Sequence, residues 1–317
     1  MRHVAVATAV AVLLGACSAA VAQPDWMSQG PDAAYAYDAS LPLEAAEDEP
    51  KVEGEFTTQR VVFASAYGER ISALLVAPVG IKQPPVLLDM HGLACNKDDA
   101  RKWAKIVGPV GFAVFAIDMP LHGERAQEGM DWHAFHDRRL GPVCMRRTVL
   151  DNLRALDYLQ TREDLDVRRI PLLGGSMGAV LGAIVAALDP RVAGACLISG
   201  AAPPGPEPGT YAQLSDPAEA DIDVTNFIGQ ISPRPVLLMT GDADRGVPIA
   251  YAEALYAAAR EPKEAFLYHG GHVPEPEVLE ANGAAERIRQ WVQQVLGDPT
   301  AAGGDQWDEG TGDLGEL

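Results

Sequence analysis

One short stretch of the chain has the residue pattern of a serine nucleophile. Residues 174–178 read G-x-S-x-G, with Ser176 at the centre and Gly174 and Gly178 on either side. A serine on a sharp turn between a strand and a helix exposes its hydroxyl for attack on a carbonyl carbon. Glycine is needed beside it because strand and helix crowd together there. The pattern predicts a nucleophile elbow, the alternative being a glycine-rich loop with an incidental serine.

A serine hydroxyl reacts only when a base accepts its proton and an acid orients that base. In chains with this elbow the acid follows the serine along the sequence, and the histidine follows the acid. Asp242 and Asp244 follow a predicted strand at residues 235–239, and His272 follows the next strand, at residues 265–268. We take His272 as the base and Asp244 as the acid, with Asp242 as the alternative acid.

The same chemistry requires backbone N–H groups that bind the developing oxyanion. One should belong to Met177, directly after the serine, and one to Leu93, in the loop after an earlier strand. His91 opens that loop, and we expect it to brace the loop rather than to react. The alternative is that residues 91–92 form a simple turn at the end of a strand.

The elements that position these groups are indicated by hydrophobic runs and their periodicity. Strands are expected at residues 59–64, 70–77, 86–90, 112–117, 170–173, 192–198, 235–239 and 265–268. Helices are expected at residues 102–107, 145–160, 179–188, 249–259 and 284–296. This alternation predicts one α/β domain, whose mostly parallel sheet has helices on both faces.

The charge of the chain limits its partners. The 317 residues include 25 Lys and Arg against 44 Asp and Glu, which gives a formal net charge of −19. Such a surface repels nucleic acid and anionic membranes, and no basic stripe offsets it. We therefore expect no nucleic-acid partner, while the oligomeric state stays open.

The N-terminus has the pattern of a secretory signal peptide. A basic start precedes an apolar run, residues 4–16, that is too short to span a bilayer. An A-x-A site would end the signal peptide at residue 22, whereas a sequence like a lipobox would place a lipid on Cys17. Both interpretations predict an extracytoplasmic protein, periplasmic or secreted. It would touch a membrane only through a lipid on Cys17.

The remaining segments divide by composition. Residues 23–55 are acidic and rich in Ala and Pro, which predicts an irregular leader before a catalytic domain at residues 56–297. Residues 298–317 are acidic and rich in glycine, which predicts a disordered tail. Irregular segments at residues 127–143 and 201–217 are expected to border the substrate pocket.

Together these motifs resemble the α/β-hydrolase family over about residues 59–296. The matching segments are residues 91–92, 118–123, 174–178, 241–248 and 270–272. Within the family the chain is most similar to the carboxylesterases that resemble dienelactone hydrolases and acetyl xylan esterases. It departs from dienelactone hydrolases themselves, which use a cysteine nucleophile, because Ser176 occupies that position.

The resemblance implies a serine carboxylesterase that acts on small-molecule esters through a triad and an acyl-enzyme, without cofactor or metal. It also favours Asp244 as the acid. The segment between Ile198 and Pro235 shows no long amphipathic helix, which predicts short acyl groups. A thioesterase or lactonase could use the same triad. A catalytically inactive binding module is the alternative from another class, because a fold does not determine function.

Other polar residues receive minor roles. His133 and His136, with Asp137 beside them, could be metal ligands, but two histidines without a firm third ligand are a weak signal, and we expect this loop to line the pocket. Structural roles are expected for His122 and His269, and a polar turn for Lys97 and Asp98.

Three cysteines remain besides Cys17. Cys196 lies in an apolar strand and is predicted to be a buried thiol. Cys95 and Cys144 lie at the ends of predicted elements, where an oxidising compartment permits a disulfide. The sequence does not decide whether that disulfide forms.

Overall fold

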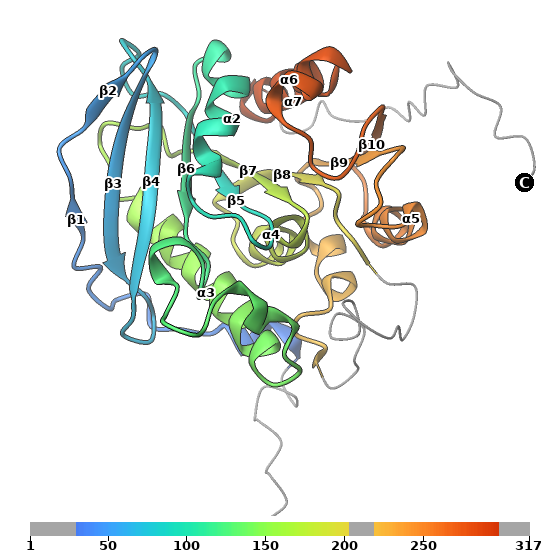
Figure 1. The fold of residues 1–317 in the computed structure, drawn as a ribbon, viewed down its shortest axis with the longest axis horizontal. Coiled ribbons are helices and arrows are strands. Elements are labelled where there is room, and N and C mark those ends of the chain that lie inside the picture. Colours follow the sequence, from blue (N-terminus) through green and yellow to red (C-terminus); the bar gives the residue numbers. More distant parts are fainter. Residues whose placement is uncertain (1–29, 203–218, 298–317) are drawn as a thin grey trace, which may run out of the picture.

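A ten-stranded sheet runs through the molecule (Figure 1), in a computed structural model that describes residues 30–202 and 219–297. Its parallel part consists, in spatial order, of β6 (Ala113–Ile117), β5 (Val86–Met90), β7 (Ile170–Gly175), β8 (Val192–Ile198), β9 (Val236–Gly241) and β10 (Lys263–Tyr268). Beside β6 the sheet continues with antiparallel strands, namely β4 (Arg70–Pro78), β3 (Phe56–Ala64), β1 (Ala46–Glu47) and β2 (Lys51–Glu53).

The central parallel strands are continuous runs of buried residues. Every residue of β5, β6, β7, β8 and β9 is buried. A strand covered on both faces needs apolar side chains on both, so its sequence shows no alternation. The edge strand β10 differs, because most of its residues are only partly buried. The prediction of a mostly parallel sheet is confirmed.

Helices cover both faces of this sheet (Figure 1) and divide the core in two. One face packs against α3 (Leu140–Leu159), α4 (Met177–Leu188) and α5 (Ile249–Ala258). The other face packs against α2 (Asp99–Val107), α6 (Pro276–Ala281) and α7 (Ala284–Gly297). Helix α4 is apolar on nearly all sides because it lies between the sheet and α3.

The described residues also include six short 3-10 helices. They are η1 (Pro31–Tyr35), η2 (Gly108–Val110), η3 (Gly123–Arg125), η4 (Trp132–His136), η7 (Val224–Asn226) and η8 (Ile228–Gln230). None of the helices in the described ranges has the length and apolar character needed to cross a bilayer.

The leader at residues 23–55, predicted to be irregular, contains two short strands at Ala46–Glu47 and Lys51–Glu53. Both β1 and β2 pair antiparallel with β3 and extend the sheet by two short strands. All their residues are exposed, so no hydrophobic alternation marks them as strands. Earlier in this segment, Tyr35 is buried and its hydroxyl donates to the backbone carbonyl of Asp221.

The segment at residues 127–143 is also less irregular than predicted. It contains η4, and α3 begins at Leu140 rather than near residue 145. Pro142 lies in the first turn of α3, where a proline removes no helical hydrogen bond. The predicted signal peptide with Cys17, residues 203–217 of the second pocket segment, and the acidic tail lie outside the described residues.

Candidate active site

Ser176 forms the turn between β7 and α4. Its backbone has φ 56° and ψ −118°, a conformation that residues with a Cβ rarely adopt. The backbone N–H of Ser176 donates to the Ile198 carbonyl at 2.8 Å, which ties the turn to β8. Such strained residues persist only where the surrounding structure holds them, and they are common at reactive sites.

The flanking glycines leave room for this turn. A Cβ on Gly178 would lie 1.9 Å from the Met90 carbonyl oxygen, and a Cβ on Gly174 would lie 2.3 Å from the Gly178 carbonyl oxygen. Both contacts are with backbone, which cannot move aside as a flexible side chain can. Strand β5, the elbow and α4 therefore meet at a distance that only glycine permits.

We expect Gly178→Ala to reduce the free energy of unfolding by about 3 kcal/mol or more, because its methyl group would push α4 away from β5. Urea unfolding followed by circular dichroism measures the change. Gly297→Ala is the matched control, since a Cβ there meets no atom within 4 Å. Equal midpoints for the two variants would contradict the expectation.

The structure brings Ser176, His272 and Asp244 into one chain of hydrogen bonds. Ser176 Oγ lies 2.8 Å from His272 Nε2. On the other side of the ring, His272 Nδ1 lies 2.9 Å and 3.1 Å from the two carboxylate oxygens of Asp244. The groups come from the ends of β7, β9 and β10, which meet at the carboxyl edge of the parallel sheet.

Asp244 is enclosed and held in one orientation. Its side chain is 1% exposed, and its Oδ1 accepts from the N–H groups of Gly246 at 2.7 Å and Val247 at 2.9 Å. Burial raises the pKa of Asp244, but hydrogen bonds from these amides, His272 and Ser199 outweigh it and hold the pKa below its ordinary value. The carboxylate is therefore ionised at neutral pH.

Asp242 makes a separate pair. Its carboxylate lies 2.8 Å from Nδ1 of His269 and accepts from the N–H of Gly270 at 3.0 Å. Both side chains of the pair are solvent-exposed. Asp242 thus links the turn after β9 to the loop after β10, which also carries His272.

The loop after β5 lies against the elbow. A Cβ on Gly92 would be 3.4 Å from both the Ser176 Cβ and the Gly175 carbonyl oxygen, so the backbone passes close to the serine. Within the described residues, the N–H groups of Leu93 and Met177 donate to no protein acceptor. Both amides are thus free to bind an oxyanion.

His91 braces this loop. It is buried, its Nε2 accepts from the N–H of Met119 at 3.1 Å, and its Nδ1 lies 2.8 Å from the Gly92 carbonyl oxygen. Since an amide can only donate, the ring proton is on Nδ1 and points to Gly92. Burial lowers the pKa of His91 to about 3, so the ring is neutral.

Lys97 and Asp98 lie in a turn directly before α2, as predicted, but the side chain of Lys97 has a further role. The side chain is buried, and its Nζ lies 2.9 Å from Oδ2 of the fully buried Asp118 and 3.0 Å from Oε1 of Glu124. The Lys97 N–H also donates to Asp118, at 2.9 Å. A buried ion pair between loops that are distant in sequence leaves no local pattern, so it could not be predicted. Asp98 is exposed, as a turn residue should be.

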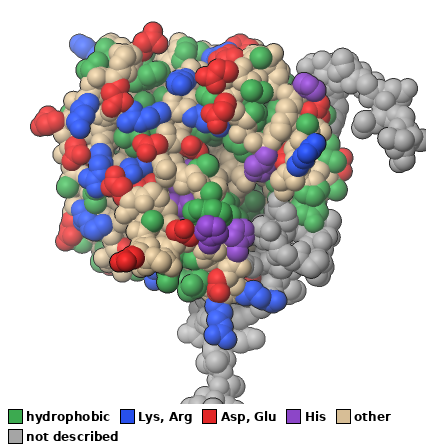
Figure 2. All heavy atoms as spheres, in the orientation of Figure 1, with side chains coloured by type: hydrophobic (Ala, Val, Ile, Leu, Met, Phe, Trp, Pro, Cys, Tyr) green, Lys and Arg blue, Asp and Glu red, His purple; other side chains and the backbone are tan. Residues whose placement is uncertain are grey.

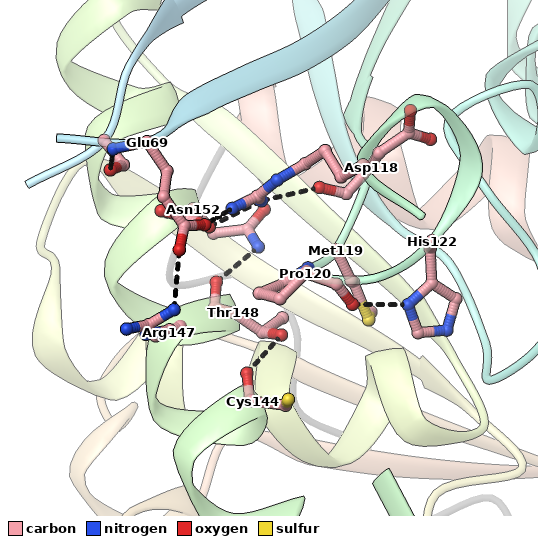
Figure 3. A network of polar contacts seen from close by, with 12 residues as sticks. Glu69, Asp118, Met119, Pro120, His122, Cys144, Arg147, Thr148 and Asn152 are labelled. Carbon is pink, nitrogen blue, oxygen red and sulfur yellow. Dashed lines mark hydrogen bonds and ion pairs between the residues drawn. The ribbon is translucent and has the colours of Figure 1, made fainter. Parts of the chain in front are cut away.

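The loop after β6, which carries Met119, is in turn tied to α3. Arg125 is nearly buried, donates to the Asp118 carbonyl at 3.0 Å and pairs with Asp151 of α3 at 2.6 Å. Figure 3 shows this region, with Arg147 of α3 bound to Glu69 at 2.7 Å. These contacts anchor the loop that donates to His91.

His122 packs between its neighbours in the same region. Its Nδ1 lies 2.9 Å from the Pro120 carbonyl oxygen (Figure 3), and its ring contacts His91 and Phe135. His133 bonds to Asp131 at 2.7 Å and stacks on Trp132. Across the described ranges, no three His, Cys, Asp or Glu side chains come together as metal ligands would.

The three described cysteines, Cys95, Cys144 and Cys196, are free thiols. Cys95 and Cys144 therefore form no disulfide in this structure, and Cys196 is buried as predicted. Figure 2 shows histidine side chains exposed on one face of the molecule, where basic and acidic side chains are interspersed.

Comparison with known proteins identifies a family for this chain. Residues 71–270 match the Dienelactone hydrolase family, which is more than half of the chain. The chain belongs to this family. Membership, together with the solved structures described below, confirms the predicted α/β-hydrolase fold.

Individual relatives share only about a third of their residues with this chain over the aligned part. The chain is 30% identical over 183 residues to the uncharacterized protein YfhR of Salmonella typhi, a match that covers 52% of this chain and 61% of the relative. The chain thus spans less than two thirds of the relative's length.

Solved structures share the fold. An acetyl xylan esterase from Paenibacillus sp. R4 has a TM-score of 0.62 at 22% identity, covering 84% of this chain and 93% of that one. Acetyl xylan esterase 1 from Thermoanaerobacterium sp. JW/SL YS485 has a TM-score of 0.64 at 20% identity, covering 86% and 94%.

Proposed function

We propose that this protein hydrolyses small carboxylic esters, with Ser176 as nucleophile, His272 as general base and Asp244 as the acid that orients it. The observation that carries the proposal is the continuous hydrogen-bond chain from Ser176 Oγ through both ring nitrogens of His272 to Asp244. Because the Asp244 carboxylate is ionised and can only accept, the ring proton is on Nδ1. Nε2 is then free to accept the proton of the serine hydroxyl.

The reaction proceeds in two halves. Ser176 Oγ attacks the ester carbonyl carbon while His272 Nε2 takes the hydroxyl proton, and the carbonyl oxygen becomes an oxyanion bound by the N–H groups of Leu93 and Met177. The carbon–oxygen bond to the alcohol then breaks, and His272 gives its proton to the departing alcohol. Water then attacks the acyl carbon while His272 Nε2 takes its proton. The bond to Ser176 Oγ breaks, the carboxylic acid product leaves, and the proton returns to Ser176.

The test is active-site labelling. A fluorophosphonate should form a covalent bond to Ser176, and mass spectrometry of the labelled peptide identifies the modified residue. The rate of p-nitrophenyl acetate hydrolysis should fall in proportion to the fraction of protein labelled. An unlabelled protein would favour the binding module instead. Labelling at another serine would refute the assignment of the nucleophile.

Short acyl groups are expected to react faster than long ones. The described part of the segment between β8 and β9 has five large apolar residues that are buried in the core, namely Ile222, Val224, Phe227, Ile228 and Ile231. Because they are buried, these residues offer no groove for an alkyl chain. We expect kcat/KM to be at least about tenfold higher for p-nitrophenyl acetate than for the decanoate, since added methylenes would find no apolar surface on the described residues of this segment. Faster hydrolysis of the decanoate would contradict this.

The mature protein is proposed to be extracytoplasmic, from the pattern of residues 1–22. Mass spectrometry of the N-terminus after expression in a bacterial host distinguishes the two routes. A lipidated Cys17 would indicate a membrane anchor, and a chain starting at Gln23 would indicate a soluble product. An intact Met1 on the mature protein would refute both.

A further inference from the structure

The loop that carries the Leu93 N–H is fastened at both of its ends to one neighbouring loop. At its start, Nε2 of His91 accepts from the N–H of Met119 at 3.1 Å. At its end, the N–H of Lys97 donates to Oδ1 of Asp118 at 2.9 Å, and Lys97 Nζ lies 2.9 Å from Oδ2 of the same carboxylate. Asp118 and Met119 are consecutive residues after β6 (Figure 3). Two adjacent residues thus hold both ends of the segment.

The Asp118 carboxylate is a fixed anchor. Its side chain is fully buried, and that of Lys97 is 7% exposed. Oδ2 of Asp118 also accepts from the N–H of Glu124 at 2.9 Å, and a Cβ on Gly123 would collide with the carboxylate, so the backbone after β6 wraps closely around it. Charge-assisted hydrogen bonds of this kind are short and strong, and removing one partner leaves an uncompensated buried charge. The ion pair therefore allows the end of the loop only one position.

Between its fastened ends the loop makes a tight turn that presents the Leu93 N–H. The N–H of Cys95 donates to the Gly92 carbonyl at 3.2 Å, and Ala94 has φ 65°. A positive φ at the third residue is the feature of a type II turn, in which the second residue, here Leu93, leaves its N–H unused. Since Ala94 is not glycine, this conformation needs support from outside the turn. A shift at either end of the loop would turn the Leu93 N–H away from the nucleophile.

We propose that the buried Lys97–Asp118 ion pair is a positioning device for the oxyanion site of this hydrolase, which aims the Leu93 N–H at the carbonyl oxygen of the ester. The pair acts through the loop and not through contact with substrate. The inference rests on the proposed function. It places the effect of the pair on the oxyanion side of the reaction, apart from proton transfer by His272.

Two variants test this. Lys97→Met removes the ammonium group. Lys97→Met combined with Asp118→Asn also removes the carboxylate charge, so no unpaired charge stays buried and the fold is protected. We expect both to lower kcat for p-nitrophenyl acetate roughly 10- to 100-fold, with KM changed less than about threefold, because a misplaced oxyanion donor weakens the transition state more than the bound ester.

Binding of a transition-state analogue separates positioning from loss of folded protein. Methylboronic acid forms a tetrahedral anion on the nucleophilic serine, so its inhibition constant should rise by about the factor by which kcat/KM falls. A smaller folded fraction would lower kcat without changing that constant. The pH midpoint of kcat/KM that reports His272 should not move, because the ion pair does not contact the base.

A double-mutant cycle tests whether the effect passes through Leu93. Leu93→Pro removes the N–H, and proline suits the second position of such a turn. In this background Lys97→Met should lower the residual kcat less than about twofold, because the donor that the pair positions is absent.

Arg191→Met is the matched control. Arg191 also pairs with two carboxylates, those of Asp157 and Asp189, but it lies directly before β8, at the end of the strand away from the site. This variant should lower the Tm and leave kcat unchanged.

Unmodified kcat in both variants at position 97 would overturn the inference, as would an unchanged boronate inhibition constant or an equal loss in the Leu93→Pro background. None of these results would touch the proposed function, which depends on the labelling and replacement of Ser176. Conversely, a fully active Ser176→Ala variant would refute the proposed function whatever the Lys97 variants do.

Discussion

Ser176→Ala should abolish ester hydrolysis, with kcat lower by a factor on the order of 10⁶. The hydroxyl of Ser176 is the group that lies 2.8 Å from His272 Nε2. Alanine leaves the base without a hydroxyl to deprotonate, so no acyl-enzyme can form. Steady-state hydrolysis of p-nitrophenyl acetate measures the loss, and fluorophosphonate labelling should disappear with it.

The fold should survive this replacement. Alanine keeps the Cβ of Ser176, so it adds no backbone strain at φ 56°. Far-UV circular dichroism and the Tm should stay close to those of the unmodified protein. Activity within about tenfold of the unmodified protein, in a preparation free of it, would rule out Ser176 as the nucleophile.

Asp244→Asn should lower kcat by roughly 10⁴. The asparagine side chain nearly matches the carboxylate in shape, so the turn closed by the Gly246 and Val247 amides can persist. An amide, however, cannot stabilise the imidazolium that forms when His272 takes the serine proton. It can also turn its NH₂ toward Nδ1, which favours the tautomer with the proton on Nε2.

Asp242→Asn is the matched comparison, because the same chemical change is made two residues away. Asp242 contacts His269 and the Gly270 amide at the solvent-exposed side of the same loops. We expect kcat to fall less than about tenfold and the Tm to fall slightly. If Asp242→Asn were nearly inactive and Asp244→Asn active, the assignment of the acid would be reversed.

Much of the fold could be predicted because its signals are local. The buried parallel strands are apolar along their whole length, and a strand–turn–helix sequence places Ser176 on the turn. The short strands β1 and β2 could not be predicted, since all their residues are exposed and only pairing with β3 makes them strands.

The choice between Asp242 and Asp244 shows the same limit within the site. Both follow β9, and their spacing does not say which side chain turns inward. That depends on the turn, in which the Asp244 N–H donates to the Gly241 carbonyl while the Gly270 amide binds Asp242. The side chains of the two residues consequently differ in exposure, at 1% for Asp244 and 40% for Asp242.

The sequence by itself determined the residue types of the site and their order along the chain, because the ends of parallel strands meet at one edge of a sheet. Only the tertiary structure showed what holds them there. Lys97 pairs with Asp118, and the Met119 N–H donates to His91, across loops that are distant in sequence. Such contacts have no period or motif, since they arise where separate strands end side by side.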